Sequence, residues 1–382
     1  MLDHFDHAPV LRVGLWNGRH PDGYGPVNIM RWFEFLELYV AGRVPKLNPL
    51  VRAAAPAVLA QQFDLRDATL EPDRLHDRFG DDYAAARAAY EAEEPVRVVF
   101  ESGAGANEVG EPGGTFELAL PSWPAPDVEP ESWYLGPDES LGSSPPAADA
   151  AGDAGADAFR FDPEAGGMTL FGGTGEYPLL ARVWDTANWT RPGPGQELSY
   201  LTEPLADDLV VAGAGYADLW VRSEATDVTV QVAVSEVRPD GVEYLVQDGW
   251  LRLGHRAVDE DRSDDLEIVH PFTEDAFRPL RPGRWVEAKV EIPSFGHVFR
   301  AGSRLRLTVG TPGRNHATWE FDNPDYGGAT PTHTVGRSAA RPSALVLGVL
   351  DGVDVPSVPP APCPALRGQA CRPFVPTENT PA

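Results

Sequence analysis

Apolar and polar residues alternate with a period of two through the middle of the chain. Over residues 228–235, valines at every second position are separated by threonine, glutamine, alanine and serine. One face of this segment is therefore predicted to be buried and the other to be polar, as in a β-strand. A Pro-Asp-Gly turn at 239–241 reverses the chain. Extended segments of similar character lie at 217–221, 242–246, 250–253 and 304–309. The pattern predicts an antiparallel β-sandwich.

A different pattern opens the chain. Residues 10–16 form a short, mostly apolar run, which predicts a buried strand, and a loop rich in Gly and Pro follows at 17–23 and carries His20. Apolar residues then recur at three- and four-residue spacing over 29–40, which predicts an amphipathic helix. Strand, loop and helix form an α/β unit. No later segment is typical of a parallel partner, so we expect this strand to have no parallel neighbour within the chain.

The rest of the chain is predicted to form helices first, then strands and finally an extended tail. Helices are predicted at 47–63 and 82–93, and brief strands at 96–100, 115–120 and 133–135. A stretch of Ser, Pro, Ala, Gly and Asp at 136–158 predicts a surface loop, and the prolines after residue 355 predict an extended tail. We therefore expect an α/β segment with helices at 1–94, a β-sandwich at 95–355 and a proline-rich tail at 356–382.

Charge narrows the classes of partner. The 58 acidic and 31 basic residues give a formal charge of -27, which repels phosphate backbones and anionic membrane surfaces. We therefore expect neither nucleic acid nor a membrane as a partner. The sequence has no apolar run near the ~20 residues that span a bilayer. Its amino terminus lacks the positive charge and the apolar stretch of a signal peptide.

The only two cysteines, Cys363 and Cys371, lie in the proline-rich tail. A disulfide between them would close a small loop and would need an oxidising, extracytoplasmic compartment. Two unrelated thiols are the other interpretation, and the spacing alone does not separate the two.

His20 is the residue whose setting is typical of catalysis. In an α/β-hydrolase sheet the general base lies in a loop just after the carboxyl end of a strand, where it can reach a serine on a neighbouring turn. A loop histidine bonded to local backbone is the alternative. Asp22 could orient the imidazole, but it lies only two residues away in the same tight loop. A solvated turn aspartate is the expected role of Asp22.

The sequence lacks an evident nucleophile. A catalytic serine needs a strained elbow, normally Gly-x-Ser-x-Gly, and no serine of this chain has that pattern. Ser102 and Ser294 come nearest, in strand-and-turn contexts with no helix after them. The acidic and histidine residues within 3–7 are expected to be solvated rather than to hold a metal ion. No cofactor or metal is expected.

Two further groups of residues have a structural and a functional interpretation. Some of the tryptophans could stack on sugars, although most are expected in the core because of the area that each buries. Those considered are Trp123, Trp133, Trp184, Trp189, Trp220, Trp250, Trp285 and Trp319. Arg304 and Arg306 alternate with leucines, and both are expected on the solvent face of a strand.

Several motifs resemble the carboxy-terminal region of X-Pro dipeptidyl-peptidases and of cocaine-esterase (CocE/NonD) hydrolases. The first is EPLADDLVVAG at 203–213, followed by LWV at 219–221. The second is VRPDG at 237–241, leading to DGWLR at 248–252, and the most specific is HVFRAGSRLRL at 297–307. Upstream, WYLG at 133–136 and FDP at 161–163 resemble the lead-in of that family. The resemblance covers roughly residues 96–349.

The resemblance implies a mainly β fold, with a jelly-roll (galactose-binding-like) sandwich preceded by a remnant of an α/β-hydrolase domain. It also implies that His20 is the general base of a serine hydrolase that cleaves acyl, ester or amide bonds, including X-Pro peptides. In that family the nucleophile elbow, the triad aspartate and the oxyanion donors lie upstream of this region. We therefore expect a truncated, carboxy-terminal portion that is inactive alone.

The partners follow from that expectation. An ester or peptide substrate would bind only if a complementing chain supplied the amino-terminal half, and a homo-oligomer is also possible. The alternative is a non-catalytic module that binds carbohydrate or docks a partner subunit.

Overall fold

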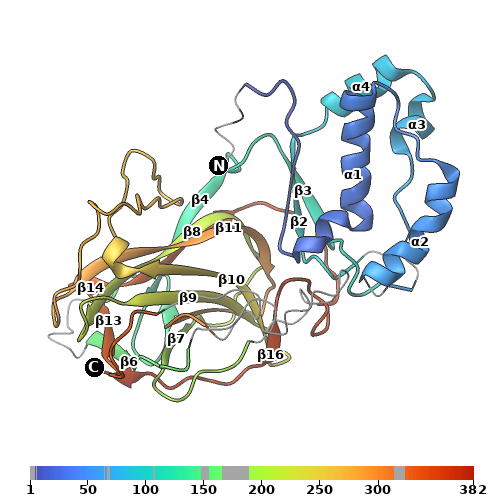
Figure 1. The fold of residues 1–382 in the computed structure, drawn as a ribbon. Helices are drawn as coiled ribbons and strands as arrows, with labels where there is room; N and C mark the ends of the chain where they lie inside the picture. Colours follow the sequence, from blue (N-terminus) through green and yellow to red (C-terminus); the bar gives the residue numbers. More distant parts are fainter. Residues whose placement is uncertain are drawn as a thin grey trace. The chain divides into compact units, whose positions relative to one another are not determined.

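The computed structural model describes residues 5, 7–63, 65–66, 69–105, 108–147, 155–165, 189–313 and 323–382 (Figure 1). Most of the regular structure is β-strand, as the sequence predicts. The described residues form two compact units. The first unit consists of the chain up to Pro126 together with Asp354–Gln369, and the second of the described residues from Asp127 to Val353 together with Ala370–Ala382.

A three-stranded sheet forms the base of the first unit. Strand β1 (Val13–Trp16) pairs in parallel with β2 (Val96–Phe100), and β3 (Phe116–Leu120) pairs antiparallel to β2. The expectation that β1 would have no parallel neighbour is therefore wrong. Because parallel strands require a long crossover, the partner lies beyond an intervening set of helices, where a local pattern does not reveal the pairing.

Four helices connect β1 to β2: α1 (Pro26–Leu36), α2 (Pro49–Phe63), α3 (Arg74–Phe79) and α4 (Tyr83–Glu91). Helix α1 continues as a π-helical turn, Glu37–Ala41, and ends at Gly42, whose φ of 66° suits a residue without a Cβ. Helix α4 begins where Asp82 accepts a hydrogen bond from the amide of Ala85. The three helices predicted from the pattern are confirmed, and the short α3 was not predicted.

Helix α1 and the turn after it bury Met30 and Leu38 but leave other large apolar side chains exposed. Glu34 and Glu37 are also buried, Glu34 paired with Arg74 (Oε2 to Nη2, 2.6 Å) and Glu37 with Arg43. Three exposed residues at four-residue spacing form what we call the apolar stripe: Trp32 (62% exposed), Leu36 (47%) and Val40 (76%). The amphipathic pattern therefore predicts the helix correctly, but these three apolar residues do not face the core of this unit.

The second unit contains two antiparallel sheets whose apolar faces share one core. The smaller sheet has the order β16-β10-β9-β12-β7 and the larger β17-β6-β13-β8-β15-β4-β5, with β11 paired to β8 and β14 to β13. The bounds are β4 (Val128–Leu135), β5 (Leu141–Gly142), β6 (Ala156–Arg160), β7 (Glu197–Leu201), β8 (Leu209–Ser223), β9 (Thr229–Val237), β10 (Val242–Arg252), β11 (Val286–Phe299), β12 (Arg304–Gly310), β13 (Thr332–Ser338), β14 (Arg341–Pro342), β15 (Ala344–Leu350), β16 (Cys371–Pro373) and β17 (Thr380–Pro381).

Strand β9 is buried on both faces. Val230, Val232 and Val234 lie in the shared core, and Gln231 and Ser235 on the opposite face are also buried. The face predicted to be polar is polar but buried, because other segments of the second unit, the end of the chain among them, cover the smaller sheet. Strand β16 pairs with β10, and Asn379 exchanges hydrogen bonds with the backbone of Ser199 in β7.

Arg306 lies beneath this covering segment and is 1% exposed. Its Nη1 donates to Oε1 of Glu243 at 2.6 Å, its Nε to Oγ of Ser199 at 2.7 Å and its Nη2 to Oγ1 of Thr377 at 2.6 Å. The expectation of a solvent-facing pair is therefore wrong for Arg306, although the side chain of Arg304 does remain partly exposed. The difference arises because only Arg306 is covered by the last residues of the chain.

The third sequence motif, at 297–307, converges on one buried carboxylate. Glu236 in β9 accepts a hydrogen bond from Oγ of Ser303 (2.8 Å), and its Oε2 lies 3.2 Å from Nε of Arg238 and 3.4 Å from Nε2 of His297. Burial alone would raise the pKa of Glu236, but hydrogen bonds and nearby charge from these partners lower it to about 2. The motif therefore supplies three partners of an anion that strand β9 buries, namely His297, Ser303 and the backbone amide of Arg300.

Candidate functional site

The loop that carries His20 follows β1 directly. Residues His20–Tyr24 form a 3-10 helix, and α1 begins two residues later. The side chain of His20 lies outside the described part of the structure. Because β1 and β2 are parallel, the loop after β1 and the loop after β2 leave the same edge of the sheet. The strand, the histidine loop and the helix are thus arranged in the predicted order.

Asp22 is fully buried rather than solvated, which contradicts the sequence-based expectation. Its Oδ1 accepts a hydrogen bond from Nε of Arg367 (2.7 Å), and its Oδ2 accepts one from the backbone amide of Arg19 (2.8 Å). Its carbonyl oxygen accepts from Nδ2 of Asn28 and from the amide of Gly25, each at 2.9 Å. Burial raises the pKa of Asp22, while the charge of Arg367 opposes that rise. The expectation fails because the cation comes from the other end of the chain.

Arg367 belongs to a carboxy-terminal segment that packs on both loops. Its backbone amide donates to the carbonyl of Ser102 at 2.8 Å, and its Nη1 donates to the carbonyl of Gly110 at 3.0 Å. The next residue, Gly368, has a φ of 71° and packs so closely that a Cβ there would lie 2.6 Å from the carbonyl carbon of Gly18. The segment therefore contacts the histidine loop near its start, at Gly18, and near its end, at Asp22.

Cys363 and Cys371 are joined in a disulfide bond that encloses this segment. Cys363 is exposed and Cys371 is half-buried. Closing a ring of this size stabilises a folded chain by about 2–3 kcal/mol in the chain-entropy model.

Neither candidate serine follows the geometry of a nucleophile elbow. Ser102 lies two residues after the end of β2 and is buried, and the chain continues into a turn instead of a helix. Ser294 is exposed inside β11, at an irregularity in its pairing with β8. Ser102 does line a small pocket together with Trp16 at the end of β1 and Asn28 in α1. That pocket lies at the edge of the sheet from which the histidine loop leaves.

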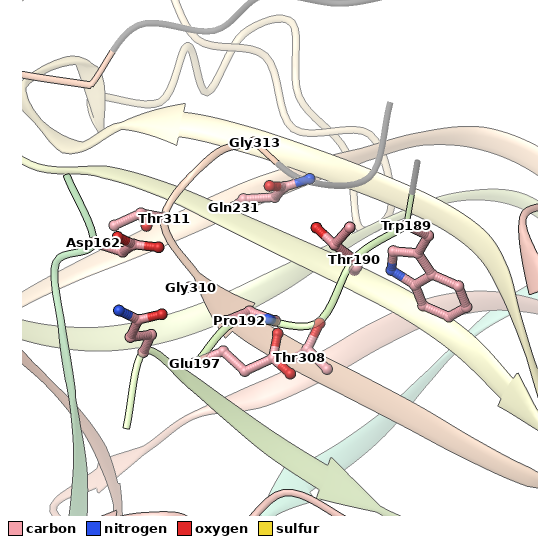
Figure 2. A pocket seen from close by; sticks show the side chains of 12 residues that line it. Asp162, Trp189, Thr190, Pro192, Glu197, Gln231, Thr308, Gly310, Thr311 and Gly313 are labelled. Atoms are coloured by element: carbon pink, nitrogen blue, oxygen red, sulfur yellow. The ribbon is translucent and has the colours of Figure 1, made fainter. Parts of the chain in front are cut away.

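A second, polar pocket lies on the smaller sheet of the second unit (Figure 2). Gln231 of β9, Thr308 of β12 and Glu197 of β7 line it, and Trp189 contributes from the segment before β7. Burial raises the pKa of Glu197, and the positive charge of Arg306 opposes that rise. An amide, a hydroxyl and a carboxylate beside an indole can hydrogen-bond and stack on a polar ligand.

The tryptophans are less buried than expected. Of the six considered that the structure describes, Trp133 is the one fully buried in the core, and the other five are half-buried. Two of those five contact arginines, because Trp285 has Arg222 and Arg341 within 5 Å of its ring centre and Trp189 has Arg372 at 3.7 Å. Trp184 and Trp319 lie outside the described residues. A large area per side chain thus does not by itself place a tryptophan in the core.

Among the described residues, no three His, Cys, Asp or Glu side chains come together as metal ligands. The helices that these residues form are also too short or too polar to cross a bilayer. Of the acidic and histidine residues within 3–7, which were expected to be solvated, Asp3, His4 and Asp6 lie outside the described residues.

Comparison with known proteins identifies the family of this chain. The model of the X-Pro dipeptidyl-peptidase C-terminal non-catalytic domain matches residues 74–346. A putative serine esterase of Mycobacterium bovis is 27% identical over 236 residues, which are 60% of this chain and 35% of that protein. The cocaine esterase of a Rhodococcus species is 26% identical over 251 residues, 60% of this chain and 39% of that protein.

Solved structures share the fold. A CocE/NonD family hydrolase from Staphylococcus aureus superposes with a TM-score of 0.52 at 15% identity, over 85% of this chain and 46% of that one. An aminopeptidase from a marine sediment Thaumarchaeota archaeon gives 0.50 at 21% identity, over 74% and 46%. The chain therefore spans less than half the length of these relatives.

Proposed function

Since the chain belongs to the family of X-Pro dipeptidyl-peptidase C-terminal non-catalytic domains, we propose that it acts as the carboxy-terminal part of a serine hydrolase. Its substrates would be acyl compounds with an ester or amide bond. In this proposal the second unit is a jelly-roll, galactose-binding-like accessory domain. The first unit is the end of an α/β-hydrolase domain, in which β1 and β2 are its last parallel strands. The similarity to serine and cocaine esterases supports the reaction class.

The observation that carries the proposal is the position of His20 immediately after a strand with a parallel neighbour. In a complete enzyme a serine hydroxyl would attack the substrate carbonyl, and His20 would accept its proton and return it to the leaving group. Backbone amides would hold the oxyanion. Asp22 does not serve as the triad acid in this proposal, because Arg367 and the amide of Arg19 engage its two carboxylate oxygens.

The nucleophile, the triad acid and the oxyanion donors would come from an α/β-hydrolase region outside these 382 residues. More than half of each relative lies outside the match, which leaves ample length for such a region. Two features of the first unit would provide contacts for this α/β-hydrolase region. Within the described sheet β1 pairs on one side only, and the apolar stripe exposes three large apolar side chains.

We expect the isolated chain to be catalytically silent. It should release no nitrophenol from nitrophenyl esters, cleave no X-Pro chromogenic peptide and take no label from an alkyl fluorophosphonate, because it lacks a serine elbow. Co-expression with an α/β-hydrolase region that carries the elbow should restore turnover. His20→Ala should then lower kcat by about 10³-fold or more, whereas His76→Ala in α3 should leave it unchanged. Serine-type turnover that survives His20→Ala would contradict the proposal.

The apolar stripe gives a separate prediction about docking. Trp32→Ser should weaken co-purification of the hydrolase region at least about tenfold, since central aromatic residues dominate most interfaces. Leu50→Ser is the matched control, because Leu50 in α2 is 80% exposed but lies outside the stripe. Equal recovery of the hydrolase region by the two variants would show that the stripe is not the contact.

A second candidate function is carbohydrate binding in the polar pocket of the second unit. The hydrogen-bonding groups of Gln231, Thr308 and Glu197 beside Trp189 favour it. Retention of the chain on polysaccharide resins, reduced by Gln231→Ala or Trp189→Ala, would support this alternative.

A further inference from the structure

We infer that Arg367 and the Cys363–Cys371 disulfide form a redox-sensitive clamp on the loop that carries His20. Arg367 is a positioning residue in this inference, because it acts on the loop through Asp22. The inference rests on the proposed function for the importance of His20, but the clamp itself is defined by contacts that do not depend on catalysis.

Asp22 organises the loop that carries His20. Its carboxylate accepts a hydrogen bond from the amide of Arg19, the residue before His20. Its carbonyl oxygen accepts hydrogen bonds from the amide of Gly25 and the side chain of Asn28, which follow the loop. The loop conformation therefore depends on keeping this carboxylate buried and ionised. A buried carboxylate needs a cation to offset its desolvation, and Arg367 is the cation in contact with it, at 2.7 Å.

The position of Arg367 depends on the contacts of its own backbone. Residues 365–368 lie against the loops after β1 and β2, with the amide of Arg367 bound to the carbonyl of Ser102. A Cβ on Gly103 would collide with the carbonyl oxygen of Ala365, and one on Gly368 would collide with Gly18. Both glycines have a positive φ. The close contacts on either side of Arg367 leave its backbone little freedom as long as the segment stays in place.

The disulfide closes a ring in which Arg367 lies midway between the two cysteines. The exposed position of Cys363 allows a dithiol to attack. One thiolate of the dithiol attacks a cysteine sulfur and forms a mixed disulfide, and its second thiol then resolves that bond. The products are two cysteine thiols and the oxidised dithiol, so two electrons pass to the protein. The opened segment can then leave Asp22 without its cation.

Amide hydrogen exchange tests the clamp on the wild-type chain, with and without dithiothreitol. The amide of Arg19 reports its hydrogen bond to the carboxylate of Asp22. The amide of Arg367 reports its hydrogen bond to the carbonyl of Ser102. Reduction should speed their exchange about 30- to 150-fold, the factor that corresponds to loss of a ring closure of this size. Amides of β9 in the second unit should keep their rates. Unchanged exchange at Arg19, or an equal acceleration throughout the chain, would overturn the clamp.

Variants separate the role of Arg367 from that of the disulfide. Arg367→Met should free the Arg19 amide even in the oxidised protein, and Arg367→Lys should restore part of the protection because it keeps the charge. Arg52→Met removes another ion pair of the first unit (Arg52 to Asp73, 2.7 Å) and should not affect the Arg19 amide.

The His20 ring signal in nuclear magnetic resonance spectra gives a further readout. It should shift on reduction and in Arg367→Met, but not in Arg52→Met. A His20 signal that stays unchanged on reduction would overturn the positioning role. These measurements need no turnover, so failure to reconstitute a hydrolase would leave them interpretable.

Discussion

Replacing Arg306 with methionine is expected to lower the free energy of unfolding of the second unit by about 3–5 kcal/mol, the usual loss when one partner of a buried ion pair is removed. Arg306 binds Glu243, Ser199 and Thr377 beneath the end of the chain. Without it, Glu243 remains buried with Arg372 as its other cation, at 2.9 Å. The covering residues also lose an anchor to β12.

The neighbouring arginine of the same strand is the matched control. Arg304 is partly exposed, and its Nη2 lies 3.8 Å from a carboxylate oxygen of Glu203, which is itself 94% exposed. Arg304→Met should therefore change the free energy of unfolding by no more than about 0.5 kcal/mol. Urea denaturation followed by tryptophan fluorescence measures both variants. Similar losses from the two substitutions would contradict the assignment of Arg306 as the buried member of the pair.

Acidification is expected to destabilise the second unit through Glu236. Its pKa is about 2 in the folded protein, against an ordinary value of 4.5. As the pH falls below 4.5, the unfolded chain takes up a proton at this position while the native carboxylate stays ionised. The stability that Glu236 contributes is thus complete above pH 4.5 and is lost progressively as the pH falls toward 2. The shift corresponds to about 3 kcal/mol.

Urea midpoints measured at a series of pH values test this dependence. Glu236→Gln should be less stable at pH 7 and should lose less stability than the wild type between pH 4.5 and 2. Glu203→Gln, at an exposed position, should keep the wild-type slope. Burial also lowers the pKa of His333 to about 4, so its contribution falls in a separate window, as the pH drops from 6.5 to 4. A Glu236→Gln variant with the wild-type slope below pH 4.5 would refute the role of Glu236.

Residue patterns along the chain are enough to predict the local structure and the family. Period-two alternation predicts the antiparallel strands of the second unit, and three- and four-residue spacing predicts α1, because both signals depend on neighbours within a few residues. The motif at 297–307 identifies the family, and the family model, which matches residues 74–346, confirms it. The structure explains that motif, since His297 and Ser303 both contact buried Glu236.

Contacts between distant segments, in contrast, fix which polar residues are buried and which apolar residues are exposed. Asp22 is buried because it pairs with Arg367, 345 positions away, and Arg306 is buried because Thr377 and its neighbours cover it. The parallel pairing of β1 with β2 and the exposure of the apolar stripe also follow from the tertiary structure. In each case the outcome depends on which distant segment packs against the residue, or on whether any does. The residue pattern within one segment does not encode that.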